Sequence, residues 1–216
     1  IAEKAAKHLT PTTLELGGKS PCVVDSNVDI DKTAKRIVSG KFVNCGQTCI
    51  APDYIIVNNH VKSELISMIK KNIISTFGDS PIKSDSYGRI INKNNLTRLK
   101  ENLSNQNIEF GGRIDEKSLY IEPTLVIDPN INSEIMKEEI FGPILPILSY
   151  ENENDLEKIL NANPSPLAFY IFSNNQKFID KLIYSNKFGG CVVNDTLIHY
   201  VNSNLPFGGI GESGMG

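Results

Sequence analysis

The chain has 216 residues, of which 40% are hydrophobic and 22% are charged, and its formal net charge at pH 7 is −3. This balance is typical of a globular protein. Basic and acidic residues are interspersed, which argues against a nucleic-acid partner. The longest apolar run, around residues 144–148, is far shorter than the roughly 20 residues of a membrane-spanning helix, so we expect no membrane segment in this chain.

Strands and helices alternate along the chain, which predicts an α/β fold with a mainly parallel sheet flanked by helices. Apolar residues at helical spacing predict helices over 1–8, 29–42, 61–77, 89–104, 154–161 and 176–185. Short apolar runs predict extended segments over 12–16, 22–24, 53–57, 120–127, 144–150, 168–172 and 191–194. We therefore expect one compact domain, with part of a neighbouring domain at the start.

The ends of the chain indicate a piece of something longer. The chain opens inside a helical pattern without a methionine and stops at Gly216, within a glycine-rich loop. Residues 209–214 fit the spelling GxGxxG, but Pro206 and Phe207 lead into them where a dinucleotide site requires a strand. We interpret these glycines as a flexible loop, and we expect any nucleotide-binding Rossmann unit to lie outside this sequence.

The cysteines and histidines give little support for disulfides or a metal site. The four cysteines are too sparse for a disulfide framework, no zinc-site spacing is present, and the three histidines are scattered singly. Free thiols are typical of a reducing compartment, so we expect a cytoplasmic protein with no metal.

Three segments contain candidate catalytic or binding residues. Cys49 ends Gly-Gln-Thr-Cys, just past a predicted helix, where the backbone is free and a substrate has room. Glu15 lies between two leucines and before two glycines, and apolar surroundings would raise its pKa into the range of a general base. Glu139 and Phe141, in Glu-Glu-Ile-Phe-Gly-Pro, could offer acceptors to ribose hydroxyls and a flat face to a ring.

Each of these residues also has a plain structural interpretation. A lone cysteine is usually a small buried hydrophobe, a single glutamate on a strand usually faces water, and Glu-Glu-Ile-Phe-Gly-Pro is equally a helix end and a turn. We expect Cys49 near the carboxyl ends of the strands, where α/β ligand sites gather.

Taken together and in order, the three segments resemble the aldehyde dehydrogenase superfamily. Further segments resemble its class 3 branch, which acts on fatty and aromatic aldehydes: Ala-Pro-Asp-Tyr at 51–54, Gly-Arg-Ile-Ile-Asn at 88–92, Ile-Phe-Gly-Pro-Ile-Leu-Pro-Ile at 140–147 and Leu-Pro-Phe-Gly-Gly-Ile-Gly at 205–211. The resemblance covers essentially the whole chain. It implies an oxidoreductase that converts an aldehyde to a carboxylic acid with NAD or NADP.

The resemblance assigns roles to the candidate residues. Cys49 would attack the aldehyde to give a thiohemiacetal and, after hydride transfer, a thioester, and Glu15 would activate the hydrolytic water. Glu139 would hold the ribose on the nicotinamide side of the cofactor, with Phe141 packed nearby. Residues 1–14 would end the preceding nucleotide-binding domain and 15–216 would form the catalytic domain, without the N-terminal Rossmann domain and the C-terminal oligomerisation segment.

Several alternatives stay open at this point. Cys49 and Glu15 could belong to a cofactor-independent hydrolase, or the chain could be a structural relative that keeps only the fold. Cys45, one helical turn before Cys49, is a spectator or a partner that captures oxidised Cys49 as a disulfide; we favour the spectator. The resemblance implies a full-length homodimer or homotetramer, and an inactive isolated chain. The particular aldehyde and the choice between NAD and NADP are left open by the sequence.

Overall fold

The computed structural model describes residues 1–215; Gly216, the last residue of the expected catalytic domain, lies outside the described residues. Its centre is a seven-stranded sheet of order β10-β9-β2-β3-β8-β7-β4. The strands are β2 (Pro21–Val24), β3 (Tyr54–Asn58), β4 (Ile108–Phe110), β7 (Thr124–Ile127), β8 (Ile144–Tyr150), β9 (Ala168–Phe172) and β10 (Gly190–Val193). All neighbouring pairs are parallel except β4 with β7. The predicted mainly parallel α/β fold is therefore confirmed.

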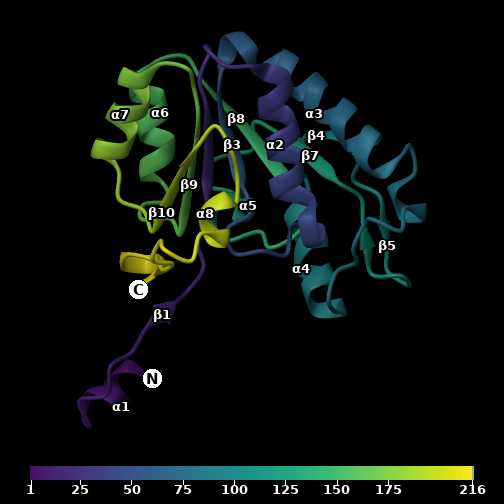
Figure 1. The fold of residues 1–216 in the computed structure, drawn as a ribbon. Helices are drawn as coiled ribbons and strands as arrows, with labels where there is room; N and C mark the ends of the chain where they lie inside the picture. Colours follow the sequence, from purple (N-terminus) through teal and green to yellow (C-terminus); the bar gives the residue numbers. More distant parts are fainter. Residues whose placement is uncertain (216) are drawn as a thin grey trace.

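Helices cover both faces of this sheet (Figure 1). The pair α2 (Ile30–Phe42) and α3 (Lys62–Phe77) lies on one side, and α6 (Glu153–Asn161) and α7 (Gln176–Ser185) lie on the other. A further helix, α4 (Lys93–Leu103), lies near the lower end of α2. Because the central strands are covered on both faces, they are largely apolar: every residue of β9 is buried, as is every residue of β2.

Asparagine and aspartate side chains fix where several helices begin. Asp29, Asn92, Asn152 and Asn175 each precede a helix, and each side chain accepts a backbone N–H from the first turn. This satisfies donors that a helix start leaves without a partner. The helices capped by Asp29, Asn152 and Asn175 begin within one residue of the expected start, whereas α4 begins at Lys93, four residues after the start expected at residue 89.

One expected strand is wrong. Residues 120–127 form two strands, β6 (Tyr120–Ile121) and β7, and β6 pairs with β5 (Ile114–Asp115) outside the main sheet. The break falls at Pro123, which has no N–H to donate to a neighbouring strand. The edge strand β4 was not expected either, and neither were the one-turn helices α5 (Glu134–Lys137) and α8 (Ile198–Val201).

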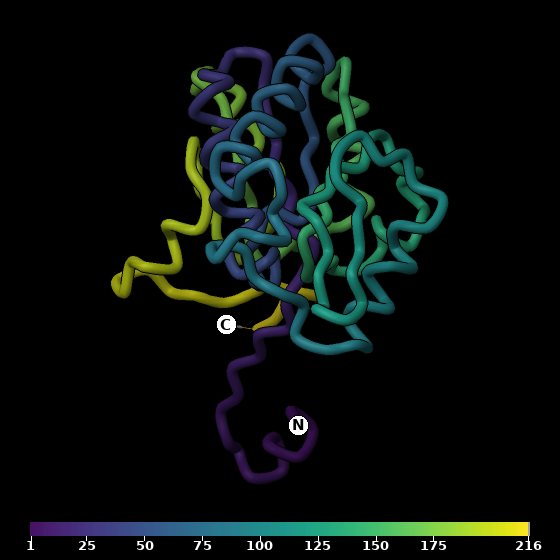
Figure 2. The backbone as a smooth tube through the Cα atoms, turned by 90° about the vertical axis from the view of Figure 1, so that its right-hand side faces the viewer, coloured from purple at the N-terminus to yellow at the C-terminus, as the bar shows by residue number. Residues whose placement is uncertain are grey.

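The first segment stands away from the rest of the chain. Helix α1 (Ala2–Ala6) has no buried residue, and both views show it extending from the lower end of the molecule (Figures 1 and 2). It leads to β1 (Leu14–Glu15), which pairs antiparallel with β11 (Gly214–Met215) in a separate small sheet. A short 3-10 turn, η4 (Gly211–Ser213), precedes β11, so the GxGxxG residues form a turn and a strand and do not begin an α-helix.

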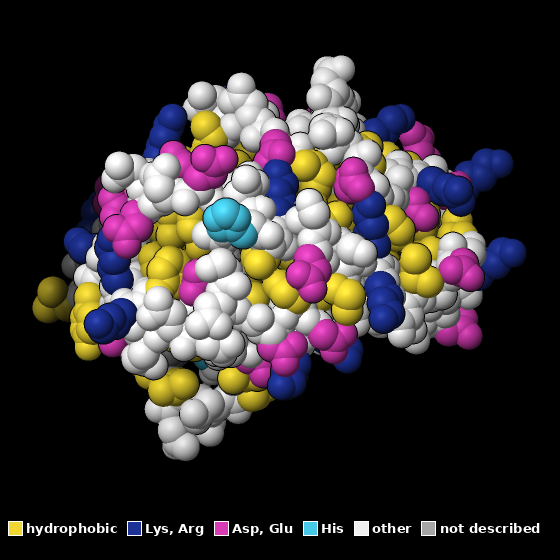
Figure 3. All heavy atoms as spheres, turned by 90° about the horizontal axis from the view of Figure 1, so that it is seen from above, with side chains coloured by type: hydrophobic (Ala, Val, Ile, Leu, Met, Phe, Trp, Pro, Cys, Tyr) yellow, Lys and Arg dark blue, Asp and Glu magenta, His cyan; other side chains and the backbone are white. Residues whose placement is uncertain are grey.

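The carboxyl ends of the parallel strands lie at the upper end of the molecule in Figure 1. Figure 3 views that end from above and shows acidic and basic side chains interspersed among apolar ones. No helix among residues 1–215 has the length and apolar character needed to cross a bilayer.

The central strands should contribute most to stability. Ile56 in β3 is fully buried, so Ile56→Ala should lower the free energy of unfolding by about 2–5 kcal/mol through lost burial and a cavity. Ile91→Ala removes the same atoms from a side chain that is 71% exposed. It should change the free energy of unfolding by no more than roughly 0.5 kcal/mol. Urea unfolding followed by circular dichroism measures both. Equal losses in the two variants would contradict this description of the core.

Candidate active site

The predicted site residues gather at the amino ends of the parallel strands. Cys49 lies between the end of α2 and the start of β3, Glu15 lies in β1 before β2, and Glu139 lies just before β8. The expectation that Cys49 would lie at the carboxyl ends is therefore wrong. Helix α2 follows the carboxyl end of β2 and runs back along the sheet. The connection after it therefore lies at the amino ends of the strands. The site lies near the lower end of α2 in Figure 1.

The loop before Cys49 has a strained, left-handed backbone. Asn44, Cys45 and Gly46 have φ angles of 50°, 57° and 72°. Residues other than glycine seldom adopt this left-handed region. Hydrogen bonds hold this turn. The Gln47 side chain donates to the Arg89 carbonyl (2.9 Å) and accepts the Ile91 N–H (2.9 Å). The loop is thus fixed to the segment that follows Gly88.

Gly46 brings the cysteine loop against the segment that follows Glu139. A Cβ atom on Gly46 would lie 2.2 Å from the carbonyl oxygen of Gly142, so only glycine allows this contact between the two backbones. The hydroxyl of buried Tyr170, on β9, donates to the Ile50 carbonyl at 2.5 Å. Cys49 is therefore held from both sides, by β9 and by the segment before β8.

A buried ion pair fixes the segment that contains Glu139. The Lys19 ammonium lies 2.6 Å from an Asp53 carboxylate oxygen, with both side chains almost fully buried. The ammonium also donates to the carbonyls of Ile135 (2.7 Å) and Glu138 (3.0 Å). Asp53 in turn accepts the Ile140 N–H at 3.0 Å. The sequence reasoning did not assign a role to Lys19 or Asp53, although both lie in segments that carry the family resemblance.

Arg98 completes this support from helix α4. Its guanidinium donates to the carbonyls of Glu139 (3.3 Å) and Ile140 (2.6 Å). Phe141 follows with a left-handed φ of 48° and an exposed fraction of 37%. The ring is thus partly exposed, and it follows two residues whose backbone carbonyls are held by Arg98. No local pattern in the sequence marks Arg98 for this role.

The carboxylates of the site differ in their surroundings. Burial, together with the charges of Asp53 and Glu15, raises the pKa of Glu139 to about 7, against the opposing effects of the Gly18 N–H and Lys41. Glu15 is exposed and accepts the Gly17 N–H at 2.9 Å. The apolar surroundings expected for Glu15 are not present, because the neighbouring Leu16 is 62% exposed.

The Cys49 thiol is half-buried, and the charges of both Glu15 and Glu139 act on it. Burial raises the pKa of Cys49, and the charges of Glu15 and Glu139 raise it further, while the backbone N–H groups of Cys49 and Ile50 act in the opposite direction. Cys45 is almost fully buried, and burial raises the pKa of its thiol to about 11. This favours the interpretation of Cys45 as a spectator.

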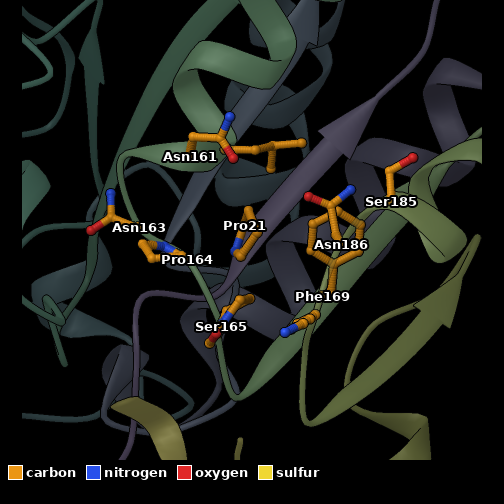
Figure 4. Close-up of a pocket in the computed structure, with 11 residues that line it drawn as sticks. Pro21, Asn161, Asn163, Pro164, Ser165, Phe169, Ser185 and Asn186 are labelled. Carbon is orange, nitrogen blue, oxygen red and sulfur yellow. The ribbon is translucent and has the colours of Figure 1, made fainter. Parts of the chain in front are cut away.

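A cavity of about 240 Å³ adjoins Glu139. Its lining includes Gly17, Gly18, Glu139 and Glu212. A second cavity, of about 220 Å³, is lined by Pro21, Asn163, Phe169 and neighbours (Figure 4). None of the four predicted site residues lines the second cavity. The structure thus brings Cys49, Glu15 and Glu139 together and places an open volume beside Glu139.

These features describe an α/β protein with one thiol and two carboxylates at the amino ends of its parallel strands. The sequence profile of the aldehyde dehydrogenase family matches residues 1–216, and the chain belongs to the aldehyde dehydrogenase family. The resemblance stated from the motifs is confirmed.

The relatives include family 3 members. The chain is 47% identical over 216 residues to aldehyde dehydrogenase family 3 member A2 of Mus musculus, and all of it aligns to 45% of that protein. It is 46% identical to the dimeric NADP-preferring aldehyde dehydrogenase of Rattus norvegicus, aligning to 48% of that protein. It matches a substrate-bound structure of a Staphylococcus aureus aldehyde dehydrogenase with a TM-score of 0.96, 45% identity and coverage of 100% and 47% of the two chains. The chain thus spans about half the length of these relatives.

The contact between Gly46 and Gly142 should be essential for the site. Gly46→Ala should separate the two loops, lower stability and change the alkylation rate of Cys49, because the new Cβ would meet the Gly142 backbone. Gly78→Ala is the matched control: its φ of 78° is similar, but a Cβ there meets nothing within 4 Å. With its ψ of 175°, Gly78 lies in a backbone region that is almost restricted to glycine, so the substitution should cost about 1–3 kcal/mol of backbone strain and leave Cys49 reactivity unchanged. A Gly46→Ala protein as stable and as reactive as Gly78→Ala would contradict the proposed packing.

The charge of Glu139 should be detectable at the thiol. Since a neighbouring negative charge disfavours the thiolate, Glu139→Gln should lower the pKa of Cys49 and move its iodoacetamide alkylation profile to lower pH. The difference from the native protein should develop above about pH 7, where Glu139 is ionised. Peptide mapping identifies the alkylated cysteine. A profile that moves to higher pH, or does not move, would show that Glu139 does not act on Cys49.

Proposed function

We propose that this chain is the catalytic domain of an enzyme that oxidises an aldehyde to a carboxylic acid with NAD or NADP. The observation that supports this most directly is the convergence of Cys49, Glu15 and Glu139 from three separate segments at the amino ends of the parallel strands. Because the chain spans about half the length of its relatives, the activity is proposed for the whole protein.

Cys49 acts as the nucleophile in this proposal. Its thiolate attacks the aldehyde carbonyl to give a thiohemiacetal, whose oxyanion needs a donor placed in advance. The backbone N–H of Cys49 lies beside its own sulfur and is one such donor. Since burial keeps the thiol protonated, a base must accept its proton when it attacks, and Glu15 and Glu139 are the carboxylates whose charges act on it.

Glu15 acts as the general base for thioester hydrolysis. The Gly17 N–H holds one of its oxygens at 2.9 Å and leaves the other to accept a proton from water. Its exposed position gives water direct access, which suits a base that acts after the thioester has formed. The product acid then leaves and Cys49 returns to the thiol.

The residues present suit a nicotinamide cofactor. Glu139 offers a carboxylate to ribose hydroxyls beside an open cavity, and Phe141, two residues further on, has a partly exposed ring. The cofactor would supply the hydride acceptor for the carbon bound to Cys49. The rat relative is named NADP-preferring, which supports a nicotinamide cofactor for this chain as well.

The domain boundary and assembly belong to the same proposal. Residues 1–14 would end the preceding nucleotide-binding domain, since Ile1 and Leu9 are 96% and 93% exposed and need a covering surface. The full-length protein would be a homodimer or homotetramer, in keeping with the name of the dimeric rat relative. The four free thiols suit a cytoplasmic protein, and this location stays a prediction.

The division of labour between Cys49 and Glu15 gives the decisive experiment in the full-length protein. Glu15→Gln keeps the shape but cannot accept a proton, so steady turnover should fall about 10²- to 10⁴-fold. A first burst of NADH or NADPH, near one equivalent per site, should survive, and mass spectrometry should find the acyl group on Cys49. Cys49→Ser is the control and should remove both burst and turnover.

Three outcomes would overturn these assignments. Loss of the burst in Glu15→Gln would mean that Glu15 also activates the thiol. An acyl group on Cys22, Cys45 or Cys191 would mean that Cys49 is not the nucleophile, and turnover without NAD or NADP would favour a hydrolase.

A further inference from the structure

A two-glycine turn, Gly17 and Gly18, meets both carboxylates of the site. Gly17 is buried with a left-handed φ of 76°, and its N–H donates to a Glu15 carboxylate oxygen at 2.9 Å. A Cβ atom on Gly17 would lie 2.6 Å from Glu139 Oε2, which is closer than a Cβ approaches any non-bonded atom. The Glu139 carboxylate therefore occupies the space that a side chain at residue 17 would take.

The neighbours of this turn hold it in place. A Cβ atom on Gly18 would lie 3.1 Å from the backbone nitrogen of Leu167, so the turn packs closely on the segment before β9. Lys19, the next residue, donates to the Glu138 carbonyl at 3.0 Å. The turn is thus bonded to the residue that precedes Glu139, and its approach to the Glu139 carboxylate follows from this bond.

The consequence of a side chain at residue 17 differs from that at Gly46. A Cβ on Gly46 would meet the Gly142 backbone, which cannot move without separating two loops. A Cβ on Gly17 would meet the far end of the flexible Glu139 side chain, whose backbone carbonyl is held by Arg98. The carboxylate would therefore turn away while the backbone around it stays in place. Gly17 and Glu139 also line the same cavity of about 240 Å³, so the displacement would occur within it.

We propose that Gly17 is a positioning residue for Glu139: because it has no side chain, the Glu139 carboxylate lies against the same turn that binds Glu15, in the place where it meets the cofactor ribose. This role rests on the proposed function of Glu139, whereas the contact itself concerns only residues of this chain. A single turn then fixes the ribose-binding group and the general base relative to each other. What residue 17 supplies to Glu139 is empty space.

Gly17→Ala tests this space in the full-length protein. Because the new methyl group displaces the Glu139 carboxylate, the affinity for NADH or NADPH should fall about 10- to 100-fold, as for the loss of hydrogen bonds to a charged group. Fluorescence titration measures it. Gly78→Ala is the matched control, since Gly78 has a φ of 78° and a Cβ there meets nothing within 4 Å. It should leave the affinity unchanged. Unchanged affinity in Gly17→Ala would overturn the proposal.

A double-mutant cycle shows whether the effect passes through Glu139. Glu139→Ala removes the atoms that the new methyl group would meet, so in that background Gly17→Ala should change cofactor affinity by no more than about twofold. Equal losses in the native and Glu139→Ala backgrounds would show that residue 17 acts through the backbone alone, and would overturn the proposal. A crystal structure of unliganded Gly17→Ala should show the Glu139 carboxylate moved away from residue 17. An unmoved carboxylate would also overturn it.

The double variant also decides the case in which Gly17→Ala does not fold. If the contact with Glu139 is the cause, Gly17→Ala combined with Glu139→Ala should fold, as circular dichroism would show. A double variant that stays unfolded would overturn the proposal. The proposed function fails separately. If the carboxylate moves in Gly17→Ala but the native full-length protein binds neither NAD nor NADP, the positioning by Gly17 stands and the proposed function fails.

Discussion

The buried ion pair between Lys19 and Asp53 is the constraint on which the rest of the site depends. Lys19 precedes β2 and Asp53 precedes β3, so their contact fixes the amino ends of two adjacent strands relative to each other. The same two side chains bind three backbone groups between residues 135 and 140. Removing either charge would leave the other buried without a partner, which is strongly destabilising. The position of Glu139 therefore follows from a salt bridge that does not itself contain Glu139.

The strained turn before Cys49 has a similar dependence on its surroundings. Three successive residues with positive φ do not persist by themselves and need contacts that hold them. Gln47 supplies hydrogen bonds to the 89–91 segment, and Gly46 packs on the Gly142 backbone. Both contacts disappear if the partner segments move. The reactive thiol is consequently placed by residues far from it in sequence, on a loop with little stability of its own.

Local patterns in the sequence predicted much of the fold. Strand β9 and helix α7 were predicted with the observed bounds, because an apolar run and a helical repeat with Asn175 at its cap depend only on neighbouring residues. The motifs also named the residues that meet in the site. Their position at the amino ends of the strands was not predicted, since it depends on the direction in which α2 returns along the sheet. Lys19 and Asp53 lie 34 positions apart, so their pairing is visible only in the fold.

The small sheet formed by β1 and β11 has a consequence for how firmly Glu15 is held. It joins two residues near the start of the sequence to two near residue 215, with one additional backbone bond from the Leu16 N–H to Ser213. Such a short pairing lies at the low end of local stability, whereas the contacts around Cys49 involve the central strands. Hydrogen exchange should therefore be fast at β1 and slow at β3. Transient opening of this pairing would release the carboxylate while the thiol stays in place, so Glu15 is the most loosely held member of the site.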